Sequence, residues 1–188
     1  MKKLLLHICC APCSSAIIED LVKNFNFDIT VYFYNPNIFP ESEFRHRCDE
    51  IEGFYQRFPY AKNVKTAIDK NYNYQEYLNA IDIKNSPELA KEDEKGERCR
   101  RCYYFRMKKA YEYAITNNFD YFTTSLSISP YKDFGKIIHI GRELNKQMFL
   151  DYIFINLFER SRELSKEYNL YRQQYCGCSF SQRTAVSD

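Results

Sequence analysis

Short apolar runs alternate along this chain with longer stretches in which apolar residues recur every three or four positions. The short runs predict strands, and the longer periodic stretches predict amphipathic helices. The predicted strands cover residues 3–8, 29–34, 63–68 and 121–124. Because strands that alternate with helices are typical of an α/β domain, we expect a parallel sheet flanked by helices.

Four helices are predicted from the periodic stretches. The first follows Pro12, with Ser14 or Ser15 as its N-cap, and the second begins at Glu41. The later two are expected over residues 103–115 and from about residue 133 to residue 144. The C-terminal region after them has a less regular pattern, so no further helix is predicted there.

The segment 82–97 is polar and has no long apolar run, which indicates a loop or a broken helix. We therefore expect residues 1–188 to form one α/β domain with a polar loop inserted around residues 82–98. Charged residues make up 28% of the chain and its formal net charge is +2, which is too small to indicate nucleic-acid binding by itself.

The apolar start of the chain is interrupted by His7 after three leucines. A secretory signal needs a longer apolar stretch, of roughly 7–15 residues. No segment is long and apolar enough to predict a membrane span, so we expect a cytoplasmic protein that does not bind membranes. Clustered cysteines in that reducing compartment favour metal binding or catalysis over structural disulfides.

Polar or thiol-rich residues follow three of the predicted strands at the point where each strand ends. Cys9, Cys10 and Cys13 follow the first strand, residues 35–37 follow the second, and residues 125–133 follow the last. The carboxyl ends of parallel strands meet at one edge of a sheet, where ligands bind in α/β proteins. The sequence therefore predicts one active site at this edge.

Seven of the eight cysteines fall into three groups, and Cys48 stands apart on an apolar helix face. The pair Cys99 and Cys102 has a spacing that suits a zinc ribbon, a redox pair or two thiols on a helix. Four thiolates from this pair and the adjacent Cys9 and Cys10 are also what a [4Fe–4S] cluster requires. Burial of one of the adjacent thiols in the core is the simpler alternative.

Cys176 and Cys178 flank Gly177, whose backbone freedom suits a strained, redox-active disulfide. A metal-ligand pair or an incidental surface pair is the alternative for these two thiols. Cys48 and His7 are interpreted as core residues, because each lies within a predicted apolar strand or helix face.

The motifs LLLHICCAPCSS, YFYNPNIFPESEFRHR, GERCRRCYYFRM, TTSLSISPYKD and LYRQQYCGC resemble, in order and spacing, those of the QueH family of cobalamin-independent epoxyqueuosine reductases. The resemblance spans nearly the whole chain. It implies reduction of epoxyqueuosine to queuosine at the wobble position of a tRNA anticodon, by an iron–sulfur enzyme with a fold like that of the nucleotide α-hydrolases.

The resemblance also implies roles for the clustered thiols. Cluster ligands would be Cys9, Cys10, Cys99 and Cys102, and the redox-active pair would be Cys176 and Cys178. The family also has an additional mononuclear iron with thiolate and carboxylate ligands, and Cys13 lies where its thiolate ligand could be. The glycine-rich loop of the ATP-binding relatives is replaced here by CCAPCSS, so ATP is not expected. The resemblance to a cobalamin-independent family implies that cobalamin is not used. A low-potential donor such as ferredoxin or flavodoxin would supply electrons.

Two further groups of residues are candidates for catalysis and RNA binding. Tyr131, Lys132 or Asp133 could donate the proton to the epoxide oxygen. A basic run interleaved with aromatic residues could bind anticodon-loop phosphates and bases, and it comprises Arg98, Arg100, Arg101, Arg106, Lys108 and Lys109. A solvated helix face is the alternative for this run.

Two other functions remain open on the sequence. One is a zinc- or thiol-dependent tRNA sulfur-transfer enzyme, which shares the α/β scaffold. The other is a non-enzymatic metal-containing module that binds RNA.

Overall fold

The computed structural model describes residues 1–184, and its centre is a sheet of four parallel strands. The strands are β1 (Lys2–Ile8), β2 (Phe27–Phe33), β3 (Lys65–Ile68) and β4 (Tyr121–Thr124). Their order in the sheet is β3-β2-β1-β4, so β1 pairs with strands on both sides. This architecture confirms the predicted α/β class.

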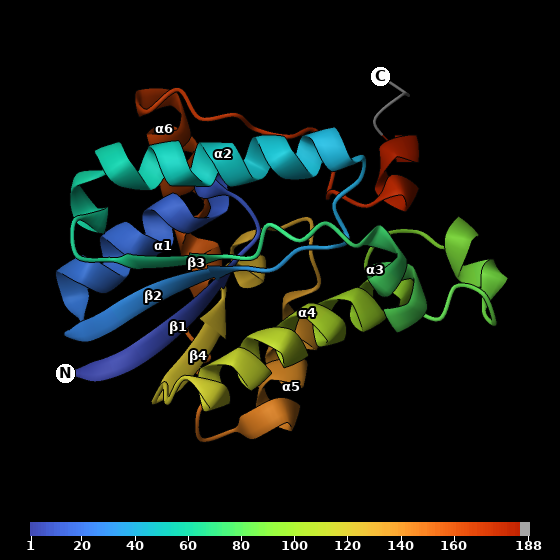
Figure 1. Ribbon diagram of the computed structural model, residues 1–188, viewed down its shortest axis with the longest axis horizontal. Helices are drawn as coiled ribbons and strands as arrows, with labels where there is room; N and C mark the ends of the chain where they lie inside the picture. The colour runs from blue at the N-terminus through green and yellow to red at the C-terminus, as the bar shows by residue number, and fades with distance from the viewer. Residues whose placement is uncertain (185–188) are drawn as a thin grey trace.

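Helices cover both faces of the sheet (Figure 1). The six α-helices of the described residues are α1 (Ala11–Asn24), α2 (Glu41–Arg57), α3 (Tyr74–Ala80), α4 (Glu97–Thr116), α5 (Phe134–Asn145) and α6 (Phe158–Glu167). Helices α1, α2 and α6 pack on one face, and α4 and α5 pack on the other. None of these helices has the length and apolar character needed to cross a membrane.

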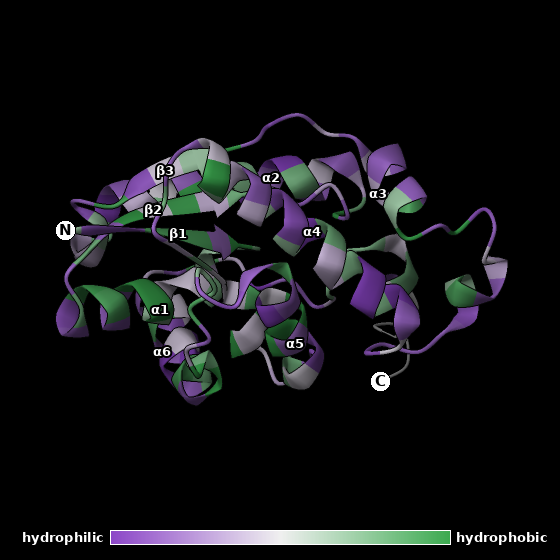
Figure 2. Cartoon of the chain, turned by 90° about the horizontal axis from the view of Figure 1, so that it is seen from below, coloured by the Kyte–Doolittle hydropathy of each residue, from purple (hydrophilic) through white to green (hydrophobic). Residues whose placement is uncertain are grey.

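The alternating side chains of β1 explain why both faces are covered. Leu4, Leu6 and Ile8 belong to the apolar core under α1, and Leu5 belongs to the core under α4. Successive side chains of a strand point to opposite faces, so a continuous apolar run needs a helix layer on each side. Figure 2 shows hydrophobic residues gathered along the strands between these layers.

The first helix begins earlier than the sequence indicates. Its N-cap is Cys10, whose sulfur accepts from the backbone N–H of Cys13 at 3.4 Å. The prediction of Ser14 or Ser15 as the cap is wrong, because both serines lie inside the first turn and donate to backbone carbonyls there. The chain therefore changes from strand to helix at the adjacent cysteines.

Helix α4 begins at Glu97, six residues before the predicted start at residue 103. The Glu92 carboxylate accepts from the backbone N–H groups of Glu97 and Arg98 at 2.7 and 2.6 Å. These bonds satisfy two N–H groups that the first turn leaves unpaired. The polar segment before it contains a short 3-10 helix, Pro87–Lys91. Cys99 and Cys102 consequently lie on the helix.

Two helices were not predicted from the sequence. Helix α3 packs against α4, and α6 lies in the region expected to be less regular. Helix α6 is joined to α1 by Arg160, whose guanidinium donates to the buried Glu19 carboxylate at 2.7 Å. The predicted helices from Glu41 and from about Asp133 are confirmed as α2 and α5.

Candidate metal and active site

The carboxyl ends of three strands meet at one edge of the sheet. After β1, the backbone N–H of Cys9 donates to Ser125 Oγ, which follows β4, at 3.2 Å. After β2, the side chain of Asn35 donates to the carbonyl of Ile8 at 2.8 Å. The predicted convergence of the three loops is thus confirmed.

Three thiols lie together at this edge. The sulfurs of Cys9, Cys10 and Cys13 are all within 4.8 Å of one another, and those of Cys9 and Cys10 are 3.8 Å apart. Cys9 and Cys10 are buried, and Cys13 is half-buried. This group, which we call the thiol trio, could hold a metal ion.

Hydrogen bonding within the thiol trio favours an anion at Cys9. The contacts with Cys10 and Cys13 hold the pKa of the Cys9 thiol well below its ordinary value. The same contacts, viewed from Cys13, raise the pKa of its thiol well above the ordinary value. The ammonium of Lys132 and the guanidinium of Arg106 add to the stabilisation of a thiolate at Cys9.

Cys99 and Cys102 lie on the first turns of α4, beside the C-terminal cysteines. Burial raises the pKa of Cys99 to about 11 and that of Cys102 to about 12, and the charge of Cys176 adds to both shifts. Cys99 also packs against the apolar cluster that contains Cys9 and Cys10. Among the residues that the structure describes, however, neither α4 thiol lies within 4.8 Å of all three sulfurs of the trio.

The chain turns at Gly177, between Cys176 and Cys178, next to the N-terminal end of α2. Gly177 has a φ of +129°, a conformation that side chains rarely adopt. Its carbonyl accepts from the backbone N–H of Phe39 at 2.8 Å. Upstream, the Gln173 amide donates to the sulfur of Cys10 at 3.7 Å. The C-terminal segment therefore covers the thiol trio directly.

Three cations lie among these thiols. Arg106 Nη1 is 4.0 Å from the sulfur of Cys102, and Arg106 Nη2 donates to Asn35. Arg47 pairs with Glu43 at 2.7 Å, and Lys132 faces Cys176 and the thiol trio. Burial alone would lower the pKa of Lys132, but the facing thiols raise it above its ordinary value.

The three cations have few carboxylate partners. Among the ion pairs of the described residues, only Arg47 has one. Arg47 Nη2 and Arg106 Nε are buried in the described structure without any hydrogen-bond partner. A buried cation needs a compensating anion. This surplus of positive charge therefore fits an anionic group held by thiolates.

A pocket of about 620 Å³ opens beside the thiols. Cys13, Lys132 and Cys176 lie in its wall, and Glu94 and Tyr131 also line it. Tyr131 is 69% exposed. Pockets of roughly 300–1,000 Å³ are typical of small-molecule sites, so this one has room for a single nucleoside.

The candidate proton donors differ in their surroundings. Asp133 caps α5, accepting from the backbone N–H of Lys136 at 3.0 Å, and this bond lowers its pKa. Asp133 is therefore an acceptor that holds the helix. Tyr131 and Lys132 line the pocket, so they remain the better-placed candidates.

The predicted basic run divides between the two faces of α4. Arg98 and Arg106 are each only 2% exposed. Arg98 donates to the carbonyls of Leu89 and Glu92 at 2.7 and 2.6 Å and so holds the preceding loop. Neither side chain can reach a phosphate, and we remove both from the predicted RNA-binding surface.

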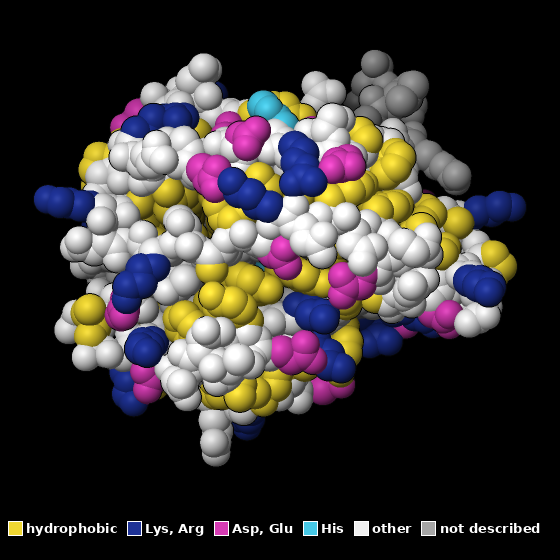
Figure 3. Space-filling view, viewed as in Figure 1, with side chains coloured by type: hydrophobic (Ala, Val, Ile, Leu, Met, Phe, Trp, Pro, Cys, Tyr) yellow, Lys and Arg dark blue, Asp and Glu magenta, His cyan; other side chains and the backbone are white. Residues whose placement is uncertain are grey.

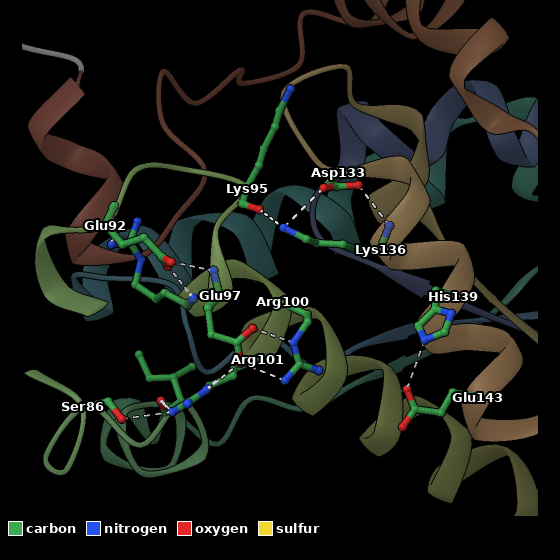
Figure 4. Close-up of polar contacts among 12 residues, drawn as sticks. Ser86, Glu92, Lys95, Glu97, Arg100, Arg101, Asp133, Lys136, His139 and Glu143 are labelled. Carbon is green, nitrogen blue, oxygen red and sulfur yellow. Dashed lines mark hydrogen bonds and ion pairs between the residues drawn. The ribbon is translucent and has the colours of Figure 1, made fainter. Parts of the chain in front are cut away.

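The other four cations of the run reach solvent. Arg100 and Arg101 both bind the carboxylate of Glu97, at 2.7 and 3.0 Å (Figure 4). Lys108 and Lys109 lie further along α4, and each faces a glutamate. On the face drawn in Figure 3, basic side chains are interspersed with acidic ones.

His7 and Cys48 are core residues, as predicted. His7 Nδ1 bonds the Thr124 hydroxyl at 2.8 Å, and its Nε2 lies 3.3 Å from the Tyr34 carbonyl. Burial, with the nearby charge of Arg106, lowers the pKa of His7 to about 3, so the ring is neutral. Cys48 is 2% exposed within the apolar core.

Sequence reasoning missed Arg47 and Glu94. Arg47 lies three residues after Phe44 and four before Ile51, so its position on the apolar stripe of α2 was a detectable signal. A charged residue at such a position calls for a buried partner. Glu94 gave no comparable signal, because it lies in a polar segment that folds over the site only in three dimensions.

The chain matches the family model described as "Epoxyqueuosine reductase QueH" over residues 4–184. It is 36% identical over 183 residues to a Streptococcus pyogenes protein named epoxyqueuosine reductase QueH, with 95% of this chain and 69% of that protein covered.

Two more proteins of the same name are similar along nearly the whole chain. The Staphylococcus aureus protein is 35% identical over 186 residues, with 95% of this chain and 75% of that protein covered. The Thermotoga maritima protein is 30% identical over 187 residues, with 96% and 91% covered.

Proposed function

This chain belongs to the epoxyqueuosine reductase QueH family, and from that membership we propose that it reduces epoxyqueuosine to queuosine in tRNA. It is accordingly an enzyme of the oxidoreductase class. The observation that carries the proposal is the meeting of the thiol trio, the Cys176 segment and a nucleoside-sized pocket at one edge of the sheet.

The reaction requires a source of two electrons. Opening an epoxide to an alkene consumes two electrons and two protons and releases water. Oxidation of two thiols to a disulfide releases two electrons and two protons, so Cys176 and Cys178 balance the reaction once per turnover. Cys176 lines the pocket, which supports its role as the thiol nearest the substrate. Ferredoxin or flavodoxin would then restore the thiols.

A [4Fe–4S] cluster is proposed as the electron relay, with Cys9, Cys10, Cys99 and Cys102 as its ligands. The donor set suits it, because thiolates are the ligands of such clusters. The buried cations Arg106 and Arg47 support it, since they would compensate the negative charge of a thiolate-bound cluster. Bound there, the cluster would supply single electrons.

An additional mononuclear iron is proposed at Cys13. This thiol belongs to the thiol trio and also lines the pocket, so a metal held by it would lie next to a bound substrate. Such an ion could act as a Lewis acid on the epoxide oxygen.

Lys132 is proposed to supply the proton to the epoxide oxygen. Its ammonium lines the pocket and faces Cys176, Cys9 and Cys13, which keep it protonated. Tyr131 at the exposed rim can stack on an unpaired base. The anticodon loop offers such bases, because sequence-specific proteins recognise RNA mostly in single-stranded loops.

The tRNA backbone is proposed to lie along the outer face of α4. Arg100, Arg101, Lys108 and Lys109 carry the exposed positive charge there. Arginine and lysine bind phosphates by charge and hydrogen bonding, and such binding weakens as salt is raised.

Three thiols within 4.8 Å can also hold a single zinc ion, as a tRNA sulfur-transfer enzyme would require. Anaerobic purification separates the two functions. Near-equal iron and acid-labile sulfide, with reduction of epoxyqueuosine tRNA by a low-potential donor, are expected. Stoichiometric zinc without sulfide would overturn the reductase proposal.

Substitution Cys176→Ser tests the redox pair. We expect the variant to keep the visible absorption of the cluster and to lose turnover on epoxyqueuosine tRNA, because only one of the two thiols remains. Cys48→Ser is the matched control, since that thiol lies in the apolar core. Full turnover by Cys176→Ser would remove the pair from the mechanism.

A further inference from the structure

Glu94 is an acidic residue in a pocket wall otherwise built from thiols, cations, amides, hydroxyls and aromatic rings. The side chains that line this pocket include Cys13, Lys132, Arg172, Tyr175 and Cys176, and Glu94 provides its sole carboxylate among the described residues. Burial raises the pKa of Cys176, and the negative charge of Glu94 makes a smaller contribution in the same direction. The carboxylate therefore lies near the thiol proposed to reduce the substrate.

The loop that carries Glu94 is held on both sides. Before it, Glu92 is fixed by the backbone N–H groups at the start of α4. After it, Lys95 donates to the carbonyl of Pro130 at 3.1 Å and its own carbonyl accepts from Lys136 (Figure 4). Glu94 is thus anchored against the loop that contains Lys132.

Glu94 itself has no partner within the described chain. It forms no hydrogen bond or ion pair with residues 1–182, although its neighbours Glu92 and Lys95 both do. The cation Arg172 points elsewhere, donating to Ser165 at 3.1 Å and lying over the ring of Phe158. A carboxylate that has no partner among the described residues, on an anchored loop in a small-molecule pocket, is suited to bind a cationic group of the ligand.

The substrate of the proposed reaction carries such a group. In epoxyqueuosine a secondary amine joins the deazaguanine methylene to the cyclopentane ring, and this amine is protonated near neutral pH. The amine is attached to the ring carbon next to the epoxide. A carboxylate that binds the amine therefore fixes the position of the reacting carbons.

We propose that Glu94 is a specificity-determining residue that binds the protonated secondary amine of the modified nucleoside and places the epoxide against Cys176 and Lys132. The inference rests on the proposed function for the identity of the substrate. It assigns to Glu94 the discrimination between cationic and neutral 7-substituted deazaguanines.

Binding of matched RNAs tests this role. Two anticodon stem-loops of identical sequence are compared, one with 7-aminomethyl-7-deazaguanine and one with neutral 7-cyano-7-deazaguanine at the wobble position. The wild-type holoenzyme is expected to bind the cationic RNA more tightly. Glu94→Gln is expected to weaken binding of the cationic RNA by about 10- to 100-fold, as for loss of a charged hydrogen bond, and to leave the neutral RNA unaffected.

Asp93→Asn is the matched control, because it removes the same charge from an exposed neighbouring side chain. It should keep the wild-type preference. Equal weakening of both RNAs by Glu94→Gln, or loss of iron from that variant, would overturn the assignment. The reductase assay on epoxyqueuosine RNA is read separately. Its failure in the wild type would overturn the proposed function, whereas the binding preference tests Glu94 in either case.

Discussion

Helix α4 presents two faces that use the same residue type differently. On the inner face, Arg98, Cys102 and Arg106 follow at intervals of four residues, and all three are buried. On the outer face, the side chains of Arg100 and Arg101 are 43% and 29% exposed and share the carboxylate of Glu97.

The difference shows that position, and not residue type, assigns an arginine its role. The outer arginines have an acidic partner that a phosphate could replace. Arg106 has an amide and a thiol as partners and leaves its Nε unbonded in the described structure. An inner-face cation can therefore act only on the site, and an outer-face cation can act on a large anionic partner.

The largest effect is expected from Arg106→Gln. The change leaves the Asn35 carbonyl oxygen without its charged donor, which we expect to lower the free energy of unfolding by about 1.5–3 kcal/mol. Removing a positive charge beside Cys102 would also disfavour the reduced state of the proposed cluster, so the midpoint potential of that cluster should become more negative. Chemical denaturation and redox titration followed by EPR measure the two effects.

Arg106→Lys is the control, because it keeps the charge and loses the fork of donors. We expect the midpoint potential of Arg106→Lys to differ less from the wild-type value than the midpoint potential of Arg106→Gln does. Equal midpoint potentials in all three proteins would show that the charge of Arg106 does not influence the proposed cluster.

A smaller and different effect is expected from the double variant Arg100→Glu and Arg101→Glu. Affinity for tRNA should fall. The slope of log K against log salt concentration should become shallower by about 1.4, because each of the two lost phosphate contacts contributes about 0.7 on single-stranded RNA. Filter binding at several salt concentrations measures both quantities.

The control is the double variant Lys62→Glu and Lys146→Glu, which makes the same change of net charge. These exposed side chains lie before β3 and after α5, at the edge of the sheet opposite the thiols. This control should keep the wild-type salt dependence. If both double variants lost affinity equally, net charge rather than the outer face of α4 would explain the binding.

The smallest effect is expected from Glu97→Gln. Hydrogen bonds from Arg100 and then Arg101 hold the pKa of Glu97 at about 2, so the carboxylate is charged at neutral pH and competes with phosphate for both arginines. Its neutralisation should raise tRNA affinity by about 2-fold, as for loss of one exposed ion pair. Affinity below that of the wild type would show that Glu97 orients the arginines for RNA.

The same pKa shift predicts an acid-dependent loss of stability. Because the folded pKa of Glu97 is depressed, its contribution is fully present above the unfolded value of about 4.3. The contribution is lost as the pH falls toward about 2. Since the side chain is 38% exposed, solvent screens the interaction and the expected change is small.

The sequence predicted the sheet well because periodicity is a local signal. The apolar runs of β1, β2 and β4 and the stripe of α2 are visible in short windows. The start of α4 was missed because it depends on Glu92, whose side chain reaches across a turn to the helix N-terminus. The same limit hid α6, whose pairing with α1 joins Arg160 to Glu19, distant in the chain.

The candidate site divides in the same way. The spacing of Cys9, Cys10 and Cys13 was enough to predict that they lie together, because all three flank one strand-to-helix turn. The basic run was predicted as a single RNA-binding surface, yet Arg98 and Arg106 are buried. A charge run in a sequence does not reveal which of its members face the core.

The sequence by itself determined the α/β class, the edge at which the candidate site lies and the identity of the thiols there, because these follow from periodicity and from residue type. Only the tertiary structure decided that Arg47, Arg106 and Lys132 lie among those thiols and that Glu94 lines the same pocket without a partner among the described residues. The physical reason is that electrostatic partners are set by distance in space, and these side chains come from four separate segments of the chain.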